Sequence, residues 1–189
     1  MIWFFINACM VGTDDVSNDT DSLGDSESTQ EIDPIENIDP ADLPAGENPC
    51  RQPALAVVNH VVDGDTFYCE TERGEEKVRV IGINTSEIGY QGMPDECYSQ
   101  EAKQKATDLL KDNKVWLTFD EDCYDTFGRT LAYVHLGVNE QDFFERLMLR
   151  SGYAWAYPFE GTDSFSEMFS QDELAAQQSN SGGWGSCDW

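Results

Sequence analysis

Three short segments combine carboxylates, an amide and arginines in a way that suits chemistry on a phosphate ester: VVDGDTF at 61–67, VRVIGINTSE at 78–87 and DTFGRTLAYV at 125–134. Cleavage of such an ester needs a positioned water, a base to deprotonate it, and positive charge against the equatorial oxygens. Carboxylate and carbonyl oxygens are the ligands that the hard cation Ca²⁺ prefers. Each segment alone has an ordinary explanation as turn or strand, but their occurrence in one chain indicates a site.

The spacing within the first two segments brings oxygen atoms toward one point. Asp65 ends a tight Asp-Gly-Asp turn, so its carboxylate can face the end of the strand expected over 77–83. That strand delivers Asn84 and the Thr85 carbonyl at its exit. Glu87 follows three residues after Asn84, close enough to reach a metal-bound water.

Two arginines need a structural explanation before they can share this site. Arg79 and Asn84 are an odd number of residues apart, so simple alternation along a strand would send them to opposite faces. A bend or bulge near Gly82 would let both serve one site. The ordinary alternatives are that Arg79 faces solvent and that Arg129 pairs with acidic residues at 120–125.

The elements that must position these residues follow from hydrophobic periodicity. Alternation predicts strands at 54–63, 66–70, 77–83, 114–119 and 130–136. Helical spacing predicts helices at 99–111, 139–152 and about 164–178. The order of three strands, a helix, two strands and two helices is that of an α+β OB-fold, a five-stranded partly closed barrel with about three helices.

In this order, and with the helix at 99–111 between the second and third segments, the motifs closely resemble the thermonuclease (staphylococcal nuclease-like) family over residues 55–180. The resemblance implies a nuclease that hydrolyses phosphodiester bonds of DNA or RNA with low sequence specificity and with Ca²⁺ as cofactor. It implies Glu87 as general base, and Arg79 and Arg129 as the arginines that bind phosphate. The metal ligands it implies are Asp65, Asn84 and the main-chain carbonyl of Thr85, with Asp63 just outside them.

One departure from the family pattern concerns the metal. The family usually reads Asp-Thr-Pro-Glu where this chain reads Asn84-Thr85-Ser86-Glu87. Asparagine keeps an oxygen ligand but removes a negative charge, so we expect weaker binding of a divalent cation. Serine in place of proline leaves the turn before Glu87 less rigid.

Aromatic residues cluster in GYAWAYPF at 152–159. We expect Tyr157 to stack on a base of the substrate, with Trp155 and Phe159 as alternatives, because aromatic side chains do this in proteins that bind single strands. The two histidines, His60 and His135, stand within apolar strands, and we expect both to be structural.

The charge balance limits how nucleic acid can be bound. The chain has 11 basic and 37 acidic residues, a net charge of −26, which excludes the broad positive surface typical of nucleic-acid binders. Residues 13–49 hold 12 of the acidic residues, no Lys or Arg and no aromatic residue, and are predicted to form a disordered acidic linker. The domain at 50–189 is still acidic, so phosphate binding must rest on a few placed arginines and a metal.

The N-terminus and the cysteines point to export. Residues 1–12 contain an apolar stretch that ends in Ala8-Cys9, resembling the tail of a bacterial lipoprotein signal whose cysteine is lipidated. We therefore expect a monomer outside the cytoplasm, secreted or anchored to a membrane through lipid on Cys9. The six cysteines are far apart and without a CxxC pair, which favours disulfides over a zinc site. The candidate pairs are Cys97 with Cys123 and Cys50 with Cys187, with Cys69 left unpaired.

Two other functions stay open at this point. Barrels of this family also occur as non-catalytic modules that bind nucleic acid or protein, and the chain could instead be a structural surface lipoprotein. The presence of Arg79, Glu87 and Arg129 together argues against the first. Metal-linked stabilisation would argue against the second.

Overall fold

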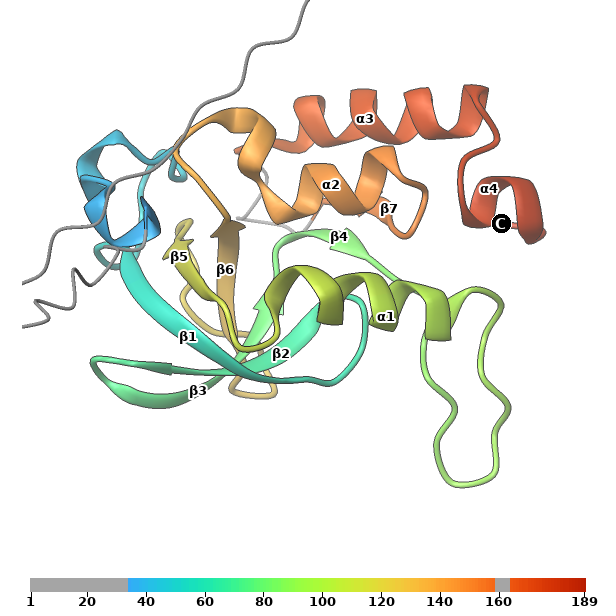
Figure 1. Cartoon of the computed structure of the whole chain (residues 1–189), viewed down its shortest axis with the longest axis horizontal. Coiled ribbons are helices and arrows are strands. Elements are labelled where there is room, and N and C mark those ends of the chain that lie inside the picture. Colours follow the sequence, from blue (N-terminus) through green and yellow to red (C-terminus); the bar gives the residue numbers. More distant parts are fainter. Residues whose placement is uncertain (1–33, 159–163) are drawn as a thin grey trace, which may run out of the picture. The chain divides into compact units, whose positions relative to one another are not determined.

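The computed structural model describes residues 34–158 and 164–189, within a folded unit that spans Ile32–Trp189. The centre of this unit is a closed barrel with the strand order β1-β2-β3-β6-β5 (Figure 1). Neighbouring strands are antiparallel except β3 and β6, which are parallel. The arrangement confirms the predicted α+β OB-fold. Its strands are β1 (Ala54–Val61), β2 (Thr66–Thr71), β3 (Gly74–Val80), β5 (Lys114–Thr118) and β6 (Thr130–His135).

Helices and one small ladder complete the fold. The three longer helices correspond to those predicted, and they are α1 (Ser99–Leu110), α2 (Phe144–Arg150) and α3 (Ser166–Gln178). The chain bends after β3 into β4 (Gly82–Asn84), which pairs with β7 (Trp155–Tyr157) in a separate antiparallel ladder. The periodicity did not indicate β7. The described residues also contain the short helices η1 (Pro34–Asn37), η2 (Pro40–Asp42), η3 (Glu140–Asp142) and α4 (Gly183–Ser186).

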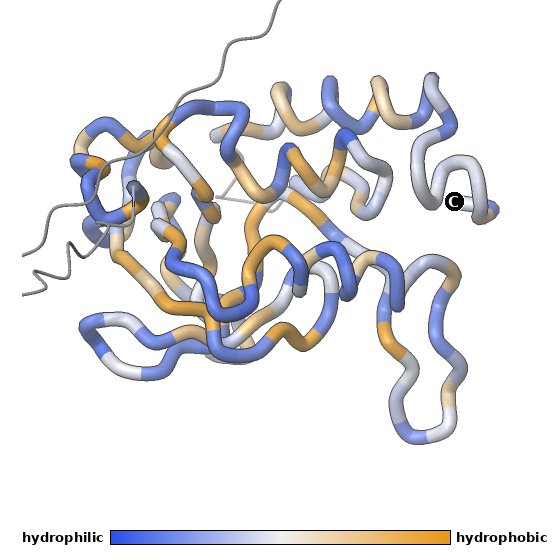
Figure 2. Tube along the Cα trace, viewed as in Figure 1, coloured by the Kyte–Doolittle hydropathy of each residue, from blue (hydrophilic) through white to orange (hydrophobic). Residues whose placement is uncertain are grey.

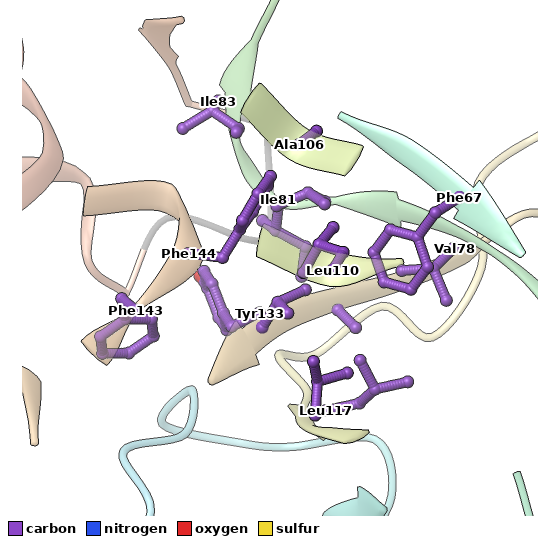
Figure 3. Close-up of a cluster of buried hydrophobic side chains, with 14 of the residues drawn as sticks. Phe67, Val78, Ile81, Ile83, Ala106, Leu110, Leu117, Tyr133, Phe143 and Phe144 are labelled. Atoms are coloured by element: carbon purple, nitrogen blue, oxygen red, sulfur yellow. The ribbon is translucent and has the colours of Figure 1, made fainter. Parts of the chain in front are cut away.

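The hydrophobic core fills the barrel and continues under α1. Phe67, Val78 and Leu117 from the barrel strands meet Ala106 and Leu110 of α1, and each is at most 1% exposed (Figure 3). Truncating a buried Phe of this kind to Ala typically costs about 3–5 kcal/mol. Figure 2 shows the same division along the backbone, with hydrophobic stretches in the barrel strands and α2 and an alternating pattern along α3. The core therefore fixes the strands whose ends carry the polar motifs.

Residues 34–49 differ from the predicted disordered linker, because they pack on the barrel. Ile35 and Leu43 are buried. The indole N–H of Trp116 donates to the Ile35 carbonyl at 2.9 Å, and the Thr118 hydroxyl donates to the Pro44 carbonyl at 2.9 Å. The apolar residues of this segment thus pack near β5, and the neighbouring prolines reduce the chain entropy that is lost when the segment is ordered. The rest of the predicted linker, and Cys9, lie outside the described residues.

Both predicted disulfide pairs are wrong, although the same four cysteines are bonded. The structure joins Cys50 to Cys123 and Cys97 to Cys187. Cys50 reaches the loop after β5 because its backbone N–H donates to Asp120 at 2.8 Å. The chain after α4 returns to the start of α1, so Cys187 meets Cys97 and not the other end of the domain. Cys69 is free and buried, as predicted for the unpaired cysteine.

Candidate active site

The turn between β1 and β2 lies directly on the segment that leaves β4. Asp63 accepts a hydrogen bond from the backbone N–H of Asp65 at 3.0 Å, which closes the Asp-Gly-Asp turn. A Cβ at Gly64 would lie 2.6 Å from the Thr85 side chain. Glycine is therefore required for the close approach that brings the two acidic residues to the exit of β4.

Asp65 is buried, and both oxygens of its carboxylate are engaged. One oxygen lies 3.3 Å from Arg79 Nε and accepts from the Thr66 hydroxyl. The other accepts from the backbone N–H of Thr85 at 2.9 Å and from the Thr85 hydroxyl at 3.1 Å. These contacts hold the carboxylate between β3 and the chain after β4, as a buried charge requires.

Arg79 and Asn84 share one site because the chain bends between them. Gly82 has φ +80°, a left-handed conformation that favours glycine. The bend lets the Arg79 guanidinium donate to the carbonyls of Val80 and Ile83, at 2.6 and 2.9 Å, and to Asn84 Oδ1 at 2.7 Å. The bend expected near Gly82 is therefore present, and Arg79 does not face solvent.

Glu87 lies at the edge of this buried cluster. Glu87 is exposed, yet the partial burial of its carboxyl, followed by the negative charges of Asp65 and Glu96, raises its pKa, while the positive charges of Arg79 and Arg129 act in the opposite direction. These charges act on Glu87 because they lie near it. Burial and the charge of Asp65 also raise the pKa of Asp63, to about 6.

Arg129 approaches from the loop between β5 and β6. Asp125 organises this loop, because its carboxylate accepts from the backbone N–H groups of Phe127 and Arg129 and binds Arg129 Nε at 2.6 Å. These hydrogen bonds outweigh burial and lower the pKa of Asp125. The expected pairing with an acidic residue at 120–125 is thus real, yet the guanidinium still acts on Glu87. Sequence reasoning did not single out Asp125, although its place four residues before Arg129 was a signal.

The aromatic residues Trp155 and Tyr157 belong to β7, the strand that pairs with β4. In the β4–β7 ladder, Trp155 stands opposite Asn84 and Tyr157 stands opposite Gly82. Directly opposed residues share a face of a ladder, so Trp155 is on the face of Asn84. Tyr157 is 44% exposed, and Phe159 lies outside the described residues. A groove of about 620 Å³ runs beside Trp155 from Ser86 to the C-terminal Trp189.

The oxygen donors at the β1–β2 turn fit Ca²⁺ in kind. Asp65, Asn84 and the Thr85 carbonyl offer hard oxygen atoms. The pKa of Asp63 is raised by burial and by the charge of Asp65, so a cation in this turn would stabilise the ionised form of Asp63. The proposed ligands carry little negative charge, because Asp65 is the only carboxylate among the three of them. In the described part of the chain, no group of three or more His, Cys, Asp or Glu side chains could hold a metal. Asp65 and Asn84 also both contact Arg79.

Comparison with known proteins now adds to this geometry. The family model described as "Staphylococcal nuclease homologue" matches residues 77–186. The chain is 30% identical to the Thermonuclease of Staphylococcus intermedius over 128 residues, which are 68% of this chain and 74% of that protein. It is 31% identical to the Thermonuclease of Staphylococcus hyicus, over 67% of this chain and 73% of that one. The chain belongs to the staphylococcal nuclease homologue family.

A further relative is the Micrococcal nuclease of Shigella flexneri, 28% identical over 64% of this chain and 68% of that protein. The match to the family model includes Arg79, Glu87 and Arg129, and it begins after the turn that carries Asp63 and Asp65. The structure links this turn to the matched region, because Asp65 accepts hydrogen bonds from the N–H and the hydroxyl of Thr85.

Proposed function

We propose that this chain is a Ca²⁺-dependent nuclease that hydrolyses phosphodiester bonds of DNA or RNA with low sequence specificity. The observation that carries the proposal is the grouping of one exposed carboxylate, Glu87, with two arginines and the buried carboxylate of Asp65. A base, two cations and a cluster of oxygen donors are the parts that phosphodiester hydrolysis needs. Family membership and the names of the relatives support the same reaction.

The arginines act as fixed positive charges. The Arg79 guanidinium is held by two carbonyls, Asn84 and Asp65, so it needs little reorganisation when negative charge grows on a phosphate. Arg129 is held at one edge by Asp125 and retains other N–H groups for phosphate. Together they bind and orient the phosphate in front of Glu87.

Glu87 is the proposed general base. Its carboxylate takes a proton from the attacking water, and its raised pKa makes it a stronger base than an ordinary surface glutamate. Ca²⁺ bound to Asp65, Asn84 and the Thr85 carbonyl would supply additional positive charge for the phosphate oxygens. Asp63 holds the turn through its bond to the Asp65 N–H.

Low base specificity agrees with the composition of the site. The named groups bind phosphate, and phosphate contacts carry no direct sequence information. Tyr157, which is 44% exposed, is proposed to stack on unpaired bases, with Trp155 and Phe159 as alternatives. Stacking needs no particular base, because every base has a π-face.

The test uses purified full-length chain with single-stranded DNA and with RNA, in the presence of Ca²⁺ and in excess chelator. Cleavage with Ca²⁺ and its loss in chelator is the expected result. Undiminished cleavage in chelator would refute the metal assignment. Binding of nucleic acid without cleavage under every condition would show a non-catalytic binding module instead.

We also propose that the protein works outside the cytoplasm, anchored through lipid on Cys9. Support comes from the apolar stretch that ends in Ala8-Cys9 and from two disulfides, which persist in oxidising compartments. No helix in the described part of the chain is long and apolar enough to cross a membrane. Labelling of cells with a palmitate analogue, compared between the parent and Cys9→Ser, tests the anchor. Unlabelled protein with reduced thiols in the cytoplasm would refute it.

A further inference from the structure

The segment that carries Glu87 is hydrogen-bonded to Glu96 and Cys97, which lie just before α1. The Ser86 hydroxyl, which is 1% exposed, donates to the Cys97 carbonyl at 2.6 Å. The Glu87 N–H donates to a carboxylate oxygen of Glu96 at 2.9 Å, and the Glu96 N–H donates to the Glu87 carbonyl at 3.0 Å. These three bonds close the loop between β4 and α1 at its base.

The loop itself gives this base little support. It projects from the barrel (Figure 1), and its side chains Tyr90 and Met93 are 70% and 68% exposed. Gln91 and Gly92 at its tip have positive φ, which marks a tight turn and not packing against the fold. Besides one hydrogen bond within the loop, from the Gly89 N–H to Asp95 at 2.8 Å, and one at the entry to α1, from the Ser99 N–H to the Glu96 carbonyl at 3.2 Å, residues 96 and 97 depend on support from outside the loop.

The C-terminal tail supplies that support. Cys97 is bonded to Cys187, directly after α4. The tail is held to the fold, because the Gly183 N–H donates to the Gly152 carbonyl at 2.8 Å. The last residue, Trp189, packs edge-on against Trp155, with ring centroids 5.2 Å apart. The tail is therefore attached at Cys97 and also contacts Trp155, the residue that stands opposite Asn84.

We propose that the Cys97–Cys187 disulfide and Glu96 are positioning elements for Glu87, so that the C-terminal tail is a functional part of the active site. This inference rests on the proposed nuclease function. The chain of contacts runs from Cys187 through Cys97 to Ser86 and, through Glu96, to Glu87. A catalytic carboxylate displaced by about 1 Å can lower turnover about a hundredfold. Reduction of this disulfide thus lowers turnover while the barrel stays folded.

The second disulfide is a matched control, because it lies outside this chain of contacts. Cys50–Cys123 joins the strand entry to the loop that precedes Arg129. Cys123 takes part in the turn that holds Arg129 through its backbone carbonyl, which accepts from the Leu131 N–H at 2.9 Å and is kept in Cys123→Ser, while Asp125 closes the turn around Arg129. Loss of the Cys50–Cys123 disulfide therefore lowers the stability of the fold and leaves kcat unchanged.

The experiment compares full-length parent with Cys97→Ser/Cys187→Ser, Cys50→Ser/Cys123→Ser, Glu96→Ala and Glu96→Gln. The substrate is a single-stranded DNA oligonucleotide with Ca²⁺, and all proteins are compared at one temperature at which every variant is folded. We expect kcat to fall about 10- to 100-fold in Cys97→Ser/Cys187→Ser with KM within about threefold of the parent. Glu96→Ala should lower kcat, and Glu96→Gln, which keeps an oxygen acceptor for the Glu87 N–H, should recover most of that loss. Equal kcat losses in both double variants, or parent kcat in Cys97→Ser/Cys187→Ser, would overturn the proposal.

Hydrogen exchange separates this proposal from the nuclease proposal. The amides of Glu87 and Glu96, which both donate in this group of bonds, should exchange about tenfold or more faster in Cys97→Ser/Cys187→Ser than in the parent. Their exchange should be unchanged in Cys50→Ser/Cys123→Ser. If the parent cleaves nothing, the nuclease proposal fails. The exchange difference would still support the brace, that is, the positioning of Glu87 by the Cys97–Cys187 disulfide and Glu96. Unchanged exchange at both amides in Cys97→Ser/Cys187→Ser would overturn the brace, whatever the activity.

Discussion

Arg79 illustrates how one side chain can be both structural and chemical. Its guanidinium is buried and contacts two carbonyls, one amide and one carboxylate. Lysine could not reproduce this planar set of contacts, because its ammonium group is a single point charge. Removal of Arg79 would also leave Asp65 as an unpaired buried charge, which typically costs about 3–5 kcal/mol. Loss of activity at this position therefore cannot by itself be assigned to chemistry.

Glu87 allows a cleaner test at the residue scale, because its side chain is exposed and its known hydrogen bond uses the backbone. We expect Glu87→Gln to lower kcat by about 10²- to 10⁴-fold, since the amide cannot accept the proton of the attacking water. The melting midpoint should stay close to that of the parent. Glu72→Gln, an exposed change in the β2–β3 hairpin, is the control. Turnover within a few-fold of the parent would show that Glu87 is not the base.

Asn84 tests the metal ligands independently of turnover. Asn84→Asp adds a carboxylate beside Asp65, and affinity for a hard cation rises with ligand charge, so calorimetry should show tighter Ca²⁺ binding. The Ca²⁺ concentration for half-maximal activity should fall as well. Gln52→Glu adds the same charge at an exposed position outside the cluster and should leave the affinity unchanged. Equal or weaker Ca²⁺ affinity in Asn84→Asp would mean that Asn84 is not a ligand.

At the scale of elements, the bend between β3 and β4 matters most, because it brings Arg79 and Asn84 to one side. Gly82→Ala should destabilise the fold by about 2–4 kcal/mol and lower activity further than the lost stability explains. The φ of +80° disfavours a Cβ, and that atom would lie 2.5 Å from the Phe169 ring. Gly74→Ala is the control, because φ is +99° there but no atom lies within 4 Å of the added Cβ. Urea unfolding and kcat measure both effects; equal losses in the two variants would contradict the steric argument.

The contact between β5 and β6 makes stability depend on pH. Burial lowers the pKa of His135 to about 4, and the ring nitrogen Nε2 lies 2.8 Å from the Thr118 hydroxyl. The unfolded chain binds the proton near pH 6.5 and the folded chain only near pH 4, so stability is present above 6.5 and is lost as the pH falls. His135 contributes a loss of about 3 kcal/mol across this window, and the raised pKa values of Asp63 and Glu145 act in the opposite direction. The His135 contribution is therefore the difference between the parent and His135→Gln in urea unfolding, which should shrink as the pH falls from 6.5 to 4, whereas the exposed His60→Gln should follow the parent. A difference between the parent and His135→Gln that stays constant across this window would contradict the assignment.

The barrel could be predicted from sequence because each of its strands has its own hydrophobic alternation and turn residues. The proximity of Asp65 to Thr85 could be predicted because a strand exit and a turn concentrate oxygen atoms locally. The β4–β7 ladder could not, since Trp155–Tyr157 is a three-residue strand whose partner lies more than 70 residues away. The disulfide pairs failed for a similar reason. They depend on where the tail after Gly183 returns, which no local pattern specifies.

At the scale of the whole molecule, two crosslinks compensate for the strong acidity of the chain. The disulfides span 73 and 90 residues, and closing loops of this length removes much of the entropy of the unfolded chain, worth about 4 kcal/mol each in the chain-entropy model. A net charge of −26 favours expansion through self-repulsion. The crosslinks oppose that expansion at the two places where the chain ends meet the fold.

The boundary of the folded unit is the last feature open to a direct test. A chain that begins at residue 32, the first residue of the folded unit, should match the free energy of unfolding of the full chain within about 0.5 kcal/mol. A chain that begins at residue 50 loses Ile35 and Leu43, which are 7% and 6% exposed, and should be less stable by about 2–5 kcal/mol. Full-length Ile35→Ala/Leu43→Ala should reproduce a large share of this loss, which separates apolar burial from chain length. Equal stability of the chains beginning at 32 and at 50, measured by urea unfolding, would restore the whole segment 13–49 to the role of a linker.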